Sequence, residues 1–453
     1  MANERVRQVF QYFGVSGVGK KQSAHGVYQP NADLDTRDKC SVSVSDNVNR
    51  TIQYDCDGVD KIREPISDRD TVITLDYSED GFTPQILARW LAYALGVAAA
   101  PTGSTANEVQ TLTRSGTVSG GTFFLTLVHE GKTGVTEPIA YDATNAVILA
   151  ALLKKTGTAT AMGKLLKAGD VAVTGTWGTA ITLTFGGRMA AANLAMITAD
   201  VTALTGSTPG ITVAQGTAGD QKIHALTRST DGTLPEFSIV TGDKNGGYDH
   251  MKYGDAAVNR ITLNGQQSAG AVVGMTVEIL CNYTSEREPG YSVPACVSIS
   301  PVKVEDLKTK IAGTWETPDV SAMSWNLSNN IPREAAFAFD DIDITNAYQR
   351  GDRPDTGWTF SIFGSPDTTL YQTAEAEETD GNDVEVILHV GQAGNRVSIT
   401  GADTKIKFQN SRMGFAGPLR QSTINIVATP YNSPPLAYSA VISQSATFLV
   451  ASS

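Results

Sequence analysis

The chain has 453 residues and a net charge of −12, from 35 lysines and arginines against 47 aspartates and glutamates. This acidic balance argues against a nucleic-acid-binding surface, which is usually basic, although DNA can still slide past such a surface. The length is too great for one core and predicts two to four domains, while 43 glycines and 41% apolar residues indicate a globular, turn-rich, mainly β protein.

The N-terminal stretch GVSGVGKKQS, residues 14–23, has the G-x-x-x-x-G-K spacing of a phosphate-binding loop. That motif needs Ser or Thr after the lysine to ligate Mg²⁺, and a helix whose N-terminus faces the phosphates. Here Lys21 follows Lys20, and Gly26 with Pro30 prevents a long helix. We therefore expect a flexible, basic arm rather than a nucleotide site.

Two strands and a helix should follow the arm. Alternation of polar and apolar residues predicts strands at 41–56 and 70–78. The next segment predicts a helix with Thr83 as its N-cap, Pro84 in its first turn and Gly96 at its C-terminus. One apolar stripe of this helix should face a core: Ile86, Leu87, Trp90, Leu91 and Ala94.

Residues 107–219 have the composition of an inserted module. The stretch is rich in Ala, Thr and Gly, lacks cysteine, and carries seven basic against six acidic residues, so the whole acidic excess lies outside it. Its flanks, 100–108 and 213–221, are small, polar and typical of flexible linkers. Within it we expect a strand at 121–129, a strand leading into a helix at 137–154, and a hairpin of 171–175 with 179–187.

The helix of this module can be capped by either Asp142 or Thr144. Its apolar residues recur on one side, which predicts a core-facing stripe of Val147, Ile148, Ala151 and Leu152. The expected result is a compact, small α+β module.

Three strands should follow the module, at 237–243, 256–266 and 274–283. Asn264 and Gly265 form the dipeptide typical of a tight hairpin turn, so we expect a turn there. The last third should contain strands at 320–330, 356–364, 384–390, 396–402, 404–414 and 422–430, with a short helix at 365–377 capped by Ser365. The segments GQAGNR (391–396) and TGADTK (400–405) should be turns between those strands.

The two halves share an order of elements. Residues 70–91 and 355–376 both predict a strand, an acidic capped turn and a helix, and 274–281 and 422–429 are the closing strands of the two halves. Two copies of one β-plus-helix unit, the first interrupted by the module, are the simplest account.

A search for reactive groups gives no catalytic, cofactor or metal residue. The five histidines are scattered, and no G-x-S-x-G elbow is present. Cys56 lies between acidic residues that would raise its pKa, and the acidic segments 339–344 and 375–380 are typical of solvated loops. The sequence therefore predicts a protein that is not an enzyme.

The cysteines and apolar stretches indicate a cellular setting. Four isolated cysteines without a C-x-x-C pair are typical of free thiols in a reducing compartment: Cys40, Cys56, Cys281 and Cys296. No apolar stretch is long enough to span a bilayer, and no signal-like segment is expected at residues 1–14. We expect synthesis in a cytosol and no membrane partner.

Residues 237–281 resemble a stretch of the major tail tube proteins of long-tailed (siphovirus-like) bacteriophages, and 323–337, 357–371 and 396–410 are similar to the C-terminal portion of that family. The most distinctive piece is LSNNI, Leu327–Ile331. In the first stretch the matching residues are Phe237, Ile239, Tyr253, Gly254, Val258, Asn259, Ile261, Leu263, Val277 and Ile279. Shorter tube proteins lack residues 107–219, which are similar to small modules of phage capsid and tail proteins.

The resemblance implies two tube-type β-sandwich domains, each with a flanking helix. The first would comprise 1–106 with 220–300, the second 301–453, and 107–219 would be an outward-projecting decoration. Three such chains would form a pseudo-sixfold ring, with a hexamer as the other arrangement, and the rings would stack around a channel that DNA passes through without specific binding.

The resemblance also implies a location and partners. The protein would lie in the virion tail after synthesis in the bacterial host cytoplasm, and would meet tail tip, tape-measure and tail terminator proteins. The basic arm with Lys20 and Lys21 could dock onto an acidic neighbouring ring, and an acidic lumen would repel phosphates.

Two other readings compete with a tail tube. The chain could be a capsid or tail decoration protein, or a carbohydrate-binding adhesin built of β-modules. An adhesin usually exposes aromatic side chains on loops, whereas the strand and helix patterns should place four tryptophans in cores: Trp90, Trp177, Trp325 and Trp358. The nucleotide-hydrolase reading ranks last because it fails at Lys21.

Overall fold

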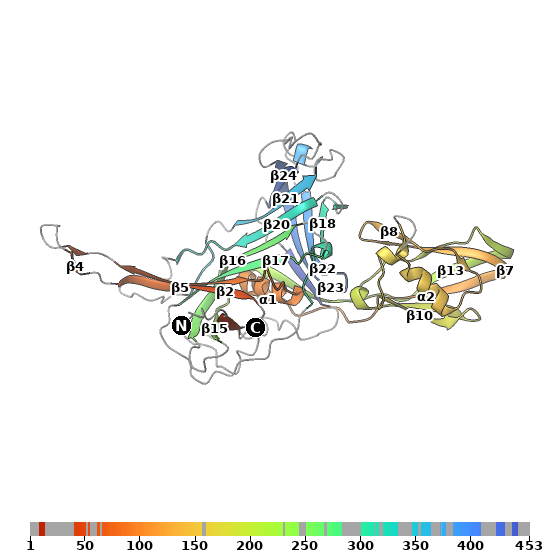
Figure 1. The fold of residues 1–453 in the computed structure, drawn as a ribbon, viewed down its shortest axis with the longest axis horizontal. Coiled ribbons are helices and arrows are strands. Elements are labelled where there is room, and N and C mark those ends of the chain that lie inside the picture. The colour runs from red at the N-terminus through yellow and green to blue at the C-terminus, as the bar shows by residue number, and fades with distance from the viewer. Residues whose placement is uncertain are drawn as a thin grey trace, which may run out of the picture.

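A computed structural model of the chain is a mainly β, antiparallel structure (Figure 1), as the sequence predicts. It describes residues 9–13, 40–50, 53–54, 61–63, 66–155, 160–229, 232–243, 251–266, 270–282, 300–311, 313–316, 320–333, 347–351, 355–363, 372, 374–376, 384–408, 423–430 and 437–442. The expected basic arm with Lys20 and Lys21 and the acidic segment at 339–344 lie outside these ranges. No helix in the described residues is long and apolar enough to cross a membrane.

Eight strands of one large sheet form two groups with the same internal order. Unit 1 is defined as β2 (Ser41–Arg50), β5 (Ile66–Asp76), β17 (Gly274–Asn282) and β16 (Met251–Gln266), side by side in that order. Unit 2 is defined as β20 (Val320–Ser328), β21 (Asp355–Phe363), β24 (Thr423–Pro430) and β23 (Asn395–Phe408), also side by side in that order. Pairing of β16 with β20 joins the units into one sheet.

Further strands extend this sheet around the two units. The short β1 (Val9–Phe13) pairs with β15 (Phe237–Asp243), which pairs with the first part of β16. In unit 2, β22 (Val384–Gln392) takes the corresponding position beside β23, and β18 (Leu307–Ile311) and β19 (Thr314–Glu316) continue outward. The remaining strands are β6 (Gly96–Ala98), β14 (Lys222–Arg228), β25 (Ala437–Ile442), and the separate pair β3 (Gln53–Tyr54) and β4 (Lys61–Arg63).

Helix α1 (Pro84–Leu95) has the ends that its sequence predicts. The Thr83 hydroxyl accepts a 3.3 Å hydrogen bond from the Ile86 amide, which satisfies one free amide of the first turn. Gly96 ends the helix with a φ of 98°, a conformation that costs glycine least. The predicted stripe is buried, and Trp90, Leu87 and Leu91 are fully enclosed.

One core lies between α1 and the large sheet and includes residues of both units. Trp90, Trp325 and Trp358 are fully buried there, and Trp177 is half-buried against a second core. These placements confirm that the four tryptophans belong to cores.

The second core belongs to residues 107–219, which form a sheet of their own with seven strands. The strand expected at 121–129 is the end of a 21-residue strand, β7, and 171–187 form the expected hairpin. The strands are β7 (Val109–His129), β8 (Lys132–Val135), β9 (Ile139–Ala140), β10 (Val171–Thr176), β11 (Ala180–Phe185), β12 (Thr198–Asp200) and β13 (Leu204–Thr217). In Figure 1 this sheet lies at one end of the long axis, and the β2–β5 hairpin extends towards the other end.

Helix α2 (Asn145–Leu153) is the helix expected in this module, but its predicted stripe is only half right. Ile148 and Leu152 are buried, whereas Val147 is 49% exposed. Thr144 occupies the N-cap position without a side-chain cap bond. The short helix packs one narrow edge towards the core, so the residues that flank this edge face outward.

Two predicted turns are wrong. Asn264 and Gly265 lie inside β16 and pair with Ser324 and Met323 of β20. The segment TGADTK lies inside the continuous strand β23, although GQAGNR does contain the turn between β22 and β23. In both cases pairing with a distant strand overrides the local turn preference.

The short helix expected at 365–377 falls largely outside the described residues. Its four described positions, 372 and 374–376, are helical.

The flanks of the module are not loose linkers. Ala106 pairs with Asp220, and Thr102 pairs with Ile223, so the two flanks run side by side as a ribbon. The Asp220 amide donates a 3.0 Å hydrogen bond to the Ala106 carbonyl. The module therefore leaves and re-enters the body at one place.

Candidate functional site

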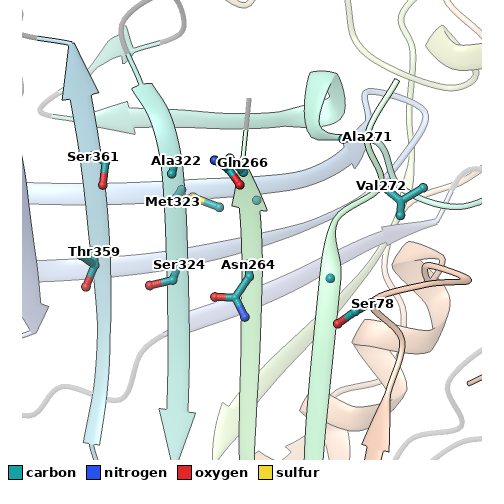
Figure 2. Close-up of a pocket in the computed structure, with 12 residues that line it drawn as sticks. Ser78, Asn264, Gln266, Ala271, Val272, Ala322, Met323, Ser324, Thr359 and Ser361 are labelled. Atoms are coloured by element: carbon teal, nitrogen blue, oxygen red, sulfur yellow. The ribbon is translucent and has the colours of Figure 1, made fainter. Parts of the chain in front are cut away.

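One face of the eight-stranded sheet is polar and bears an open depression of about 500 Å³ (Figure 2). Strands β16, β17, β20 and β21 supply most of its lining. Side chains alternate between the two faces of a strand, so the apolar residues of these strands enter the core and the polar ones face the depression. The polar side chains in Figure 2 are Ser78, Asn264, Gln266, Ser324, Thr359 and Ser361.

The chemistry available in this depression is hydrogen bonding. Its lining residues have hydroxyl or amide groups, or are apolar, and none has a titratable side chain. Such groups can form hydrogen bonds with water or with a ligand that passes over the face, but they offer no acid, base or activated nucleophile.

The same face carries few charges along the rest of the sheet, and both signs are present. Ser41, Ser43 and Ser45 of β2 are exposed on it. Strand alternation places three basic residues there, Arg260, Lys405 and Lys407. It also places three acidic residues there, Asp76, Glu278 and Asp355. The acidic excess of the chain is therefore not concentrated on the described part of this face.

The eight-stranded sheet ends in two edges. On one side, within the described residues, β2 pairs with β5 alone. On the other side, β22 stops pairing with β23 at Thr404, while β23 continues to Phe408 along β24. The corresponding place on β16, beyond the end of β15, is where β20 pairs.

The LSNNI segment is the joint between the two units. Asn329 is fully buried, and its amide nitrogen donates 2.9 Å hydrogen bonds to the carbonyls of Ala94 in α1 and Val258 in β16. Its side-chain oxygen accepts a 3.1 Å bond from Arg350, which also donates to the Leu95 carbonyl at the end of α1. These bonds satisfy carbonyls that would otherwise be buried without partners.

The module contacts the body through the turn between β7 and β8. Glu130, whose side chain is 7% exposed, forms ion pairs with Lys308 of β18 and with Arg396 of β23, the latter at 2.5 Å. Ala393 of the β22–β23 turn packs into the core of the module, and the adjacent Gly394 amide donates a 2.7 Å bond to the Arg188 carbonyl. The module is thus docked on the body and not merely tethered to it.

Electrostatics favour an ionised Glu130. Burial alone would raise the pKa of Glu130, but Lys308, His129 and Arg396 outweigh burial and lower it to about 2. The Glu130 backbone has a φ of 49° and precedes Gly131, also at positive φ, as tight hairpin turns require. Gly131 directly after an alternating strand indicates this turn, but not the contact of Glu130 with the body.

Three of the five scattered histidines lie in strands and are buried or nearly so. His129 adjoins Glu130, and His389 has its Nδ1 2.7 Å from the Ser398 hydroxyl. His224 is fully buried in β14, and neither of its ring nitrogens has a hydrogen-bond partner. Within the described ranges, no three His, Cys, Asp or Glu residues are placed to hold a metal ion.

The cysteines within the described ranges are Cys40 and Cys281, and neither forms a disulfide. Cys281 is fully buried, which raises its pKa, with Asp70 adding to the effect. Cys56 and Cys296 lie outside those ranges.

No protein-family model matches the chain, and no curated protein matches it in sequence.

Proposed function

We propose that this chain is a structural subunit of the tail tube of a long-tailed bacteriophage, which polymerises into stacked rings that conduct DNA into the host. The observation that carries the proposal is the repeated strand order of units 1 and 2, joined edge to edge through β16 and β20. A sheet built from two such units can be continued by a third unit on another chain, because the same pairing can recur.

The edges of the sheet suit this continuation. The free edge of β2 corresponds to the edge of β20 that pairs with β16. The end of β23, beyond its pairing with β22, corresponds to the part of β16 that pairs with β20. If β23 of one copy pairs with β2 of the next, each chain adds eight strands, and three chains close a pseudo-sixfold ring. Closure would pair backbone groups that otherwise invite aggregation.

The register of the proposed contact follows from the join within the chain. Across unit 1, Leu75, Val277 and Ile261 are in line, and Ile261 pairs with Leu327 of β20. Across unit 2, the line that starts from Phe360 ends at Phe408. Phe408 therefore takes the place of Ile261.

The residue pair next to Ile261 and Leu327 predicts a specific contact between two chains. Within the chain Arg260 pairs with Ser328. Lys407 precedes Phe408 as Arg260 precedes Ile261, and Asn47 pairs with Asp70 as Ser328 pairs with Asp355. Lys407 of one copy should consequently lie opposite Asn47 of the next.

The polar face of the sheet would line the channel. Its hydroxyl and amide groups, with few charges of mixed sign, offer no continuous basic surface on which DNA would be held. The passage of DNA without specific binding rests here on low charge density rather than on the acidic lumen that composition alone suggested. Residues 107–219 would project outside as a decoration.

A crosslinking experiment tests the proposal. In the double variant Asn47→Cys/Lys407→Cys, oxidation should link chains into closed trimers, and electron microscopy should show rings or hollow tubes. The control pair Ser41→Cys/Lys407→Cys is six residues, about 20 Å, out of register and should not link. The pair Arg260→Cys/Ser328→Cys should link within one chain and verifies that this geometry permits a disulfide.

The same crosslinking experiment also separates the competing functions. Crosslinked rings of six chains would support the tail tube but contradict the proposal that each chain supplies two repeats of the ring. A compact assembly that neither links through Asn47→Cys and Lys407→Cys nor stacks at high concentration would contradict the tube and favour a decoration protein or an adhesin.

A further inference from the structure

The junction between the module and the body contains a second cavity, of about 170 Å³. Residues 129, 130, 132, 164, 165, 167, 188 and 189 of the module form one wall, and 305, 306, 308 and 391–393 of the body form the other. The volume is several times the ~30 Å³ that one water occupies in the liquid, so a small polyatomic ion fits.

This cavity is cationic although the protein as a whole is acidic. Five basic side chains line it, against three acidic ones. The basic residues are Lys132, Lys164, Lys167, Arg188 and Lys308, and the acidic residues are Glu130, Glu305 and Asp306. The cavity therefore has a net positive charge where the module meets the body.

The acidic groups around the cavity are already engaged. Glu130 is held by Lys308 and Arg396, and Glu305 lies 3.6 Å from Lys167. Asp306 accepts a 3.3 Å hydrogen bond from the Lys303 amide. Arg188 is itself paired at 2.5 Å with Asp170, which does not line the cavity, so the uncompensated basic charge lies on the lysines.

Lys132 carries much of that excess. Lys132 is exposed and lines the cavity, and its ammonium group forms no hydrogen bond or ion pair within the described residues. Partial burial and the like charge of Lys308 lower the pKa of Lys132, and the nearby acids do not reverse this effect. An anion in the cavity would relieve this crowding of positive charge.

We propose that this cavity binds a small multivalent oxyanion of the phosphate class, and that the bound anion fastens the module to the body. Lysine ammonium groups from the module and Lys308 from the body would donate to its oxygens. Because both walls contribute, binding requires the docked arrangement and stabilises it by mass action. This inference is independent of the proposed tube function.

Calorimetric titration of the intact protein with inorganic phosphate tests the proposal, with chloride at matched ionic strength as the reference. We expect phosphate to bind and to raise the unfolding temperature, and Lys132→Gln to weaken binding about tenfold or more. Lys155→Gln removes the same charge from an exposed site on the module that does not line the cavity, and should bind phosphate like the parent protein.

Three outcomes would overturn the proposal. These are the absence of phosphate binding, an equal stabilisation by chloride, and equal weakening in Lys132→Gln and Lys155→Gln. Lys164→Gln is a second variant of the cavity lining. If the cavity is the site, phosphate binding should weaken in both Lys132→Gln and Lys164→Gln, which separates loss of the site from an effect confined to Lys132.

Discussion

The side-chain amide of Asn329 donates a 2.9 Å hydrogen bond to the carbonyl of Ala94, which lies 235 positions earlier in the chain. Ala94 is in the last turn of α1, where carbonyls lack partners within the helix. Asn329 follows β20, so this one side chain ties α1 to the first strand of unit 2.

Asn329→Ala should therefore destabilise the whole body. The substitution leaves the carbonyls of Ala94 and Val258 without this donor and Arg350 without this acceptor, and each buried unsatisfied group costs about 1–3 kcal/mol. We expect a loss of at least about 2 kcal/mol in urea unfolding. Ser324→Ala, on the polar face, should change stability by less than about 0.5 kcal/mol, and an equal loss in both variants would contradict this role.

The ion pairs of Glu130 should stabilise the docking of the module on the body. Glu130→Gln keeps the shape of the side chain but leaves Lys308 and Arg396 without their counter-charge in a largely buried site. We expect docking of the module to weaken by about 3 kcal/mol. Hydrogen exchange of the Gly394 amide, which bonds to the Arg188 carbonyl, should then accelerate by about 100-fold.

Glu137→Gln is the matched control for that variant. Glu137 also pairs with a lysine, Lys154, at 3.5 Å, but both side chains are over 40% exposed. An exposed pair contributes less than about 1 kcal/mol, so exchange of Gly394 should not change. If both variants leave Gly394 protected, the ion pairs of Glu130 do not hold the junction.

His389 predicts how stability depends on pH. Burial, with the adjacent charge of Arg396, lowers the pKa of His389 to about 3, whereas the unfolded chain should protonate near 6.5. The unfolded state then binds the extra proton first, so stability is full above about pH 6.5 and falls progressively towards pH 3. At about pH 5 the loss from this group should be about 2 kcal/mol.

Urea unfolding of the parent protein and of His389→Gln, at about pH 7.5 and about pH 5, measures this effect. The variant should lose less stability than the parent between the two values. Glu130 contributes in a lower window, because its carboxylate stabilises the fold above about pH 4.5 and this contribution is lost towards pH 2. An identical pH dependence in parent and variant would show that His389 is protonated equally in both states.

Local signals in the sequence predicted the parts of the fold that depend on local bonds. Thr83, Pro84 and Gly96 define the ends of α1 because caps act within one turn. Asn264 and Gly265 misled the turn prediction because their conformation is set by β20, some 60 positions away.

The junction could not be predicted in this way. Glu130 meets Lys308 and Arg396 across 178 and 266 positions, and a single charged residue at a hairpin tip is ordinarily solvated. The same limit applies to Asn329. The sequence marks LSNNI as distinctive but does not indicate that the Asn329 side chain bonds to α1. Contacts between distant segments depend on the complete topology and leave no periodic trace in the chain.

Deletion of residues 107–219 tests whether the module is needed for assembly. Ala106 and Asp220 already pair in antiparallel fashion, so an Asn-Gly turn between them should close a hairpin without strain. Loss of Glu130 exposes Lys308 and Arg396 to water, which can solvate them, so we expect the body to stay folded with its strand order intact. The deleted protein should still form rings and tubes of reduced outer diameter in electron microscopy, and a folded protein that no longer assembles would make the module part of the ring contact.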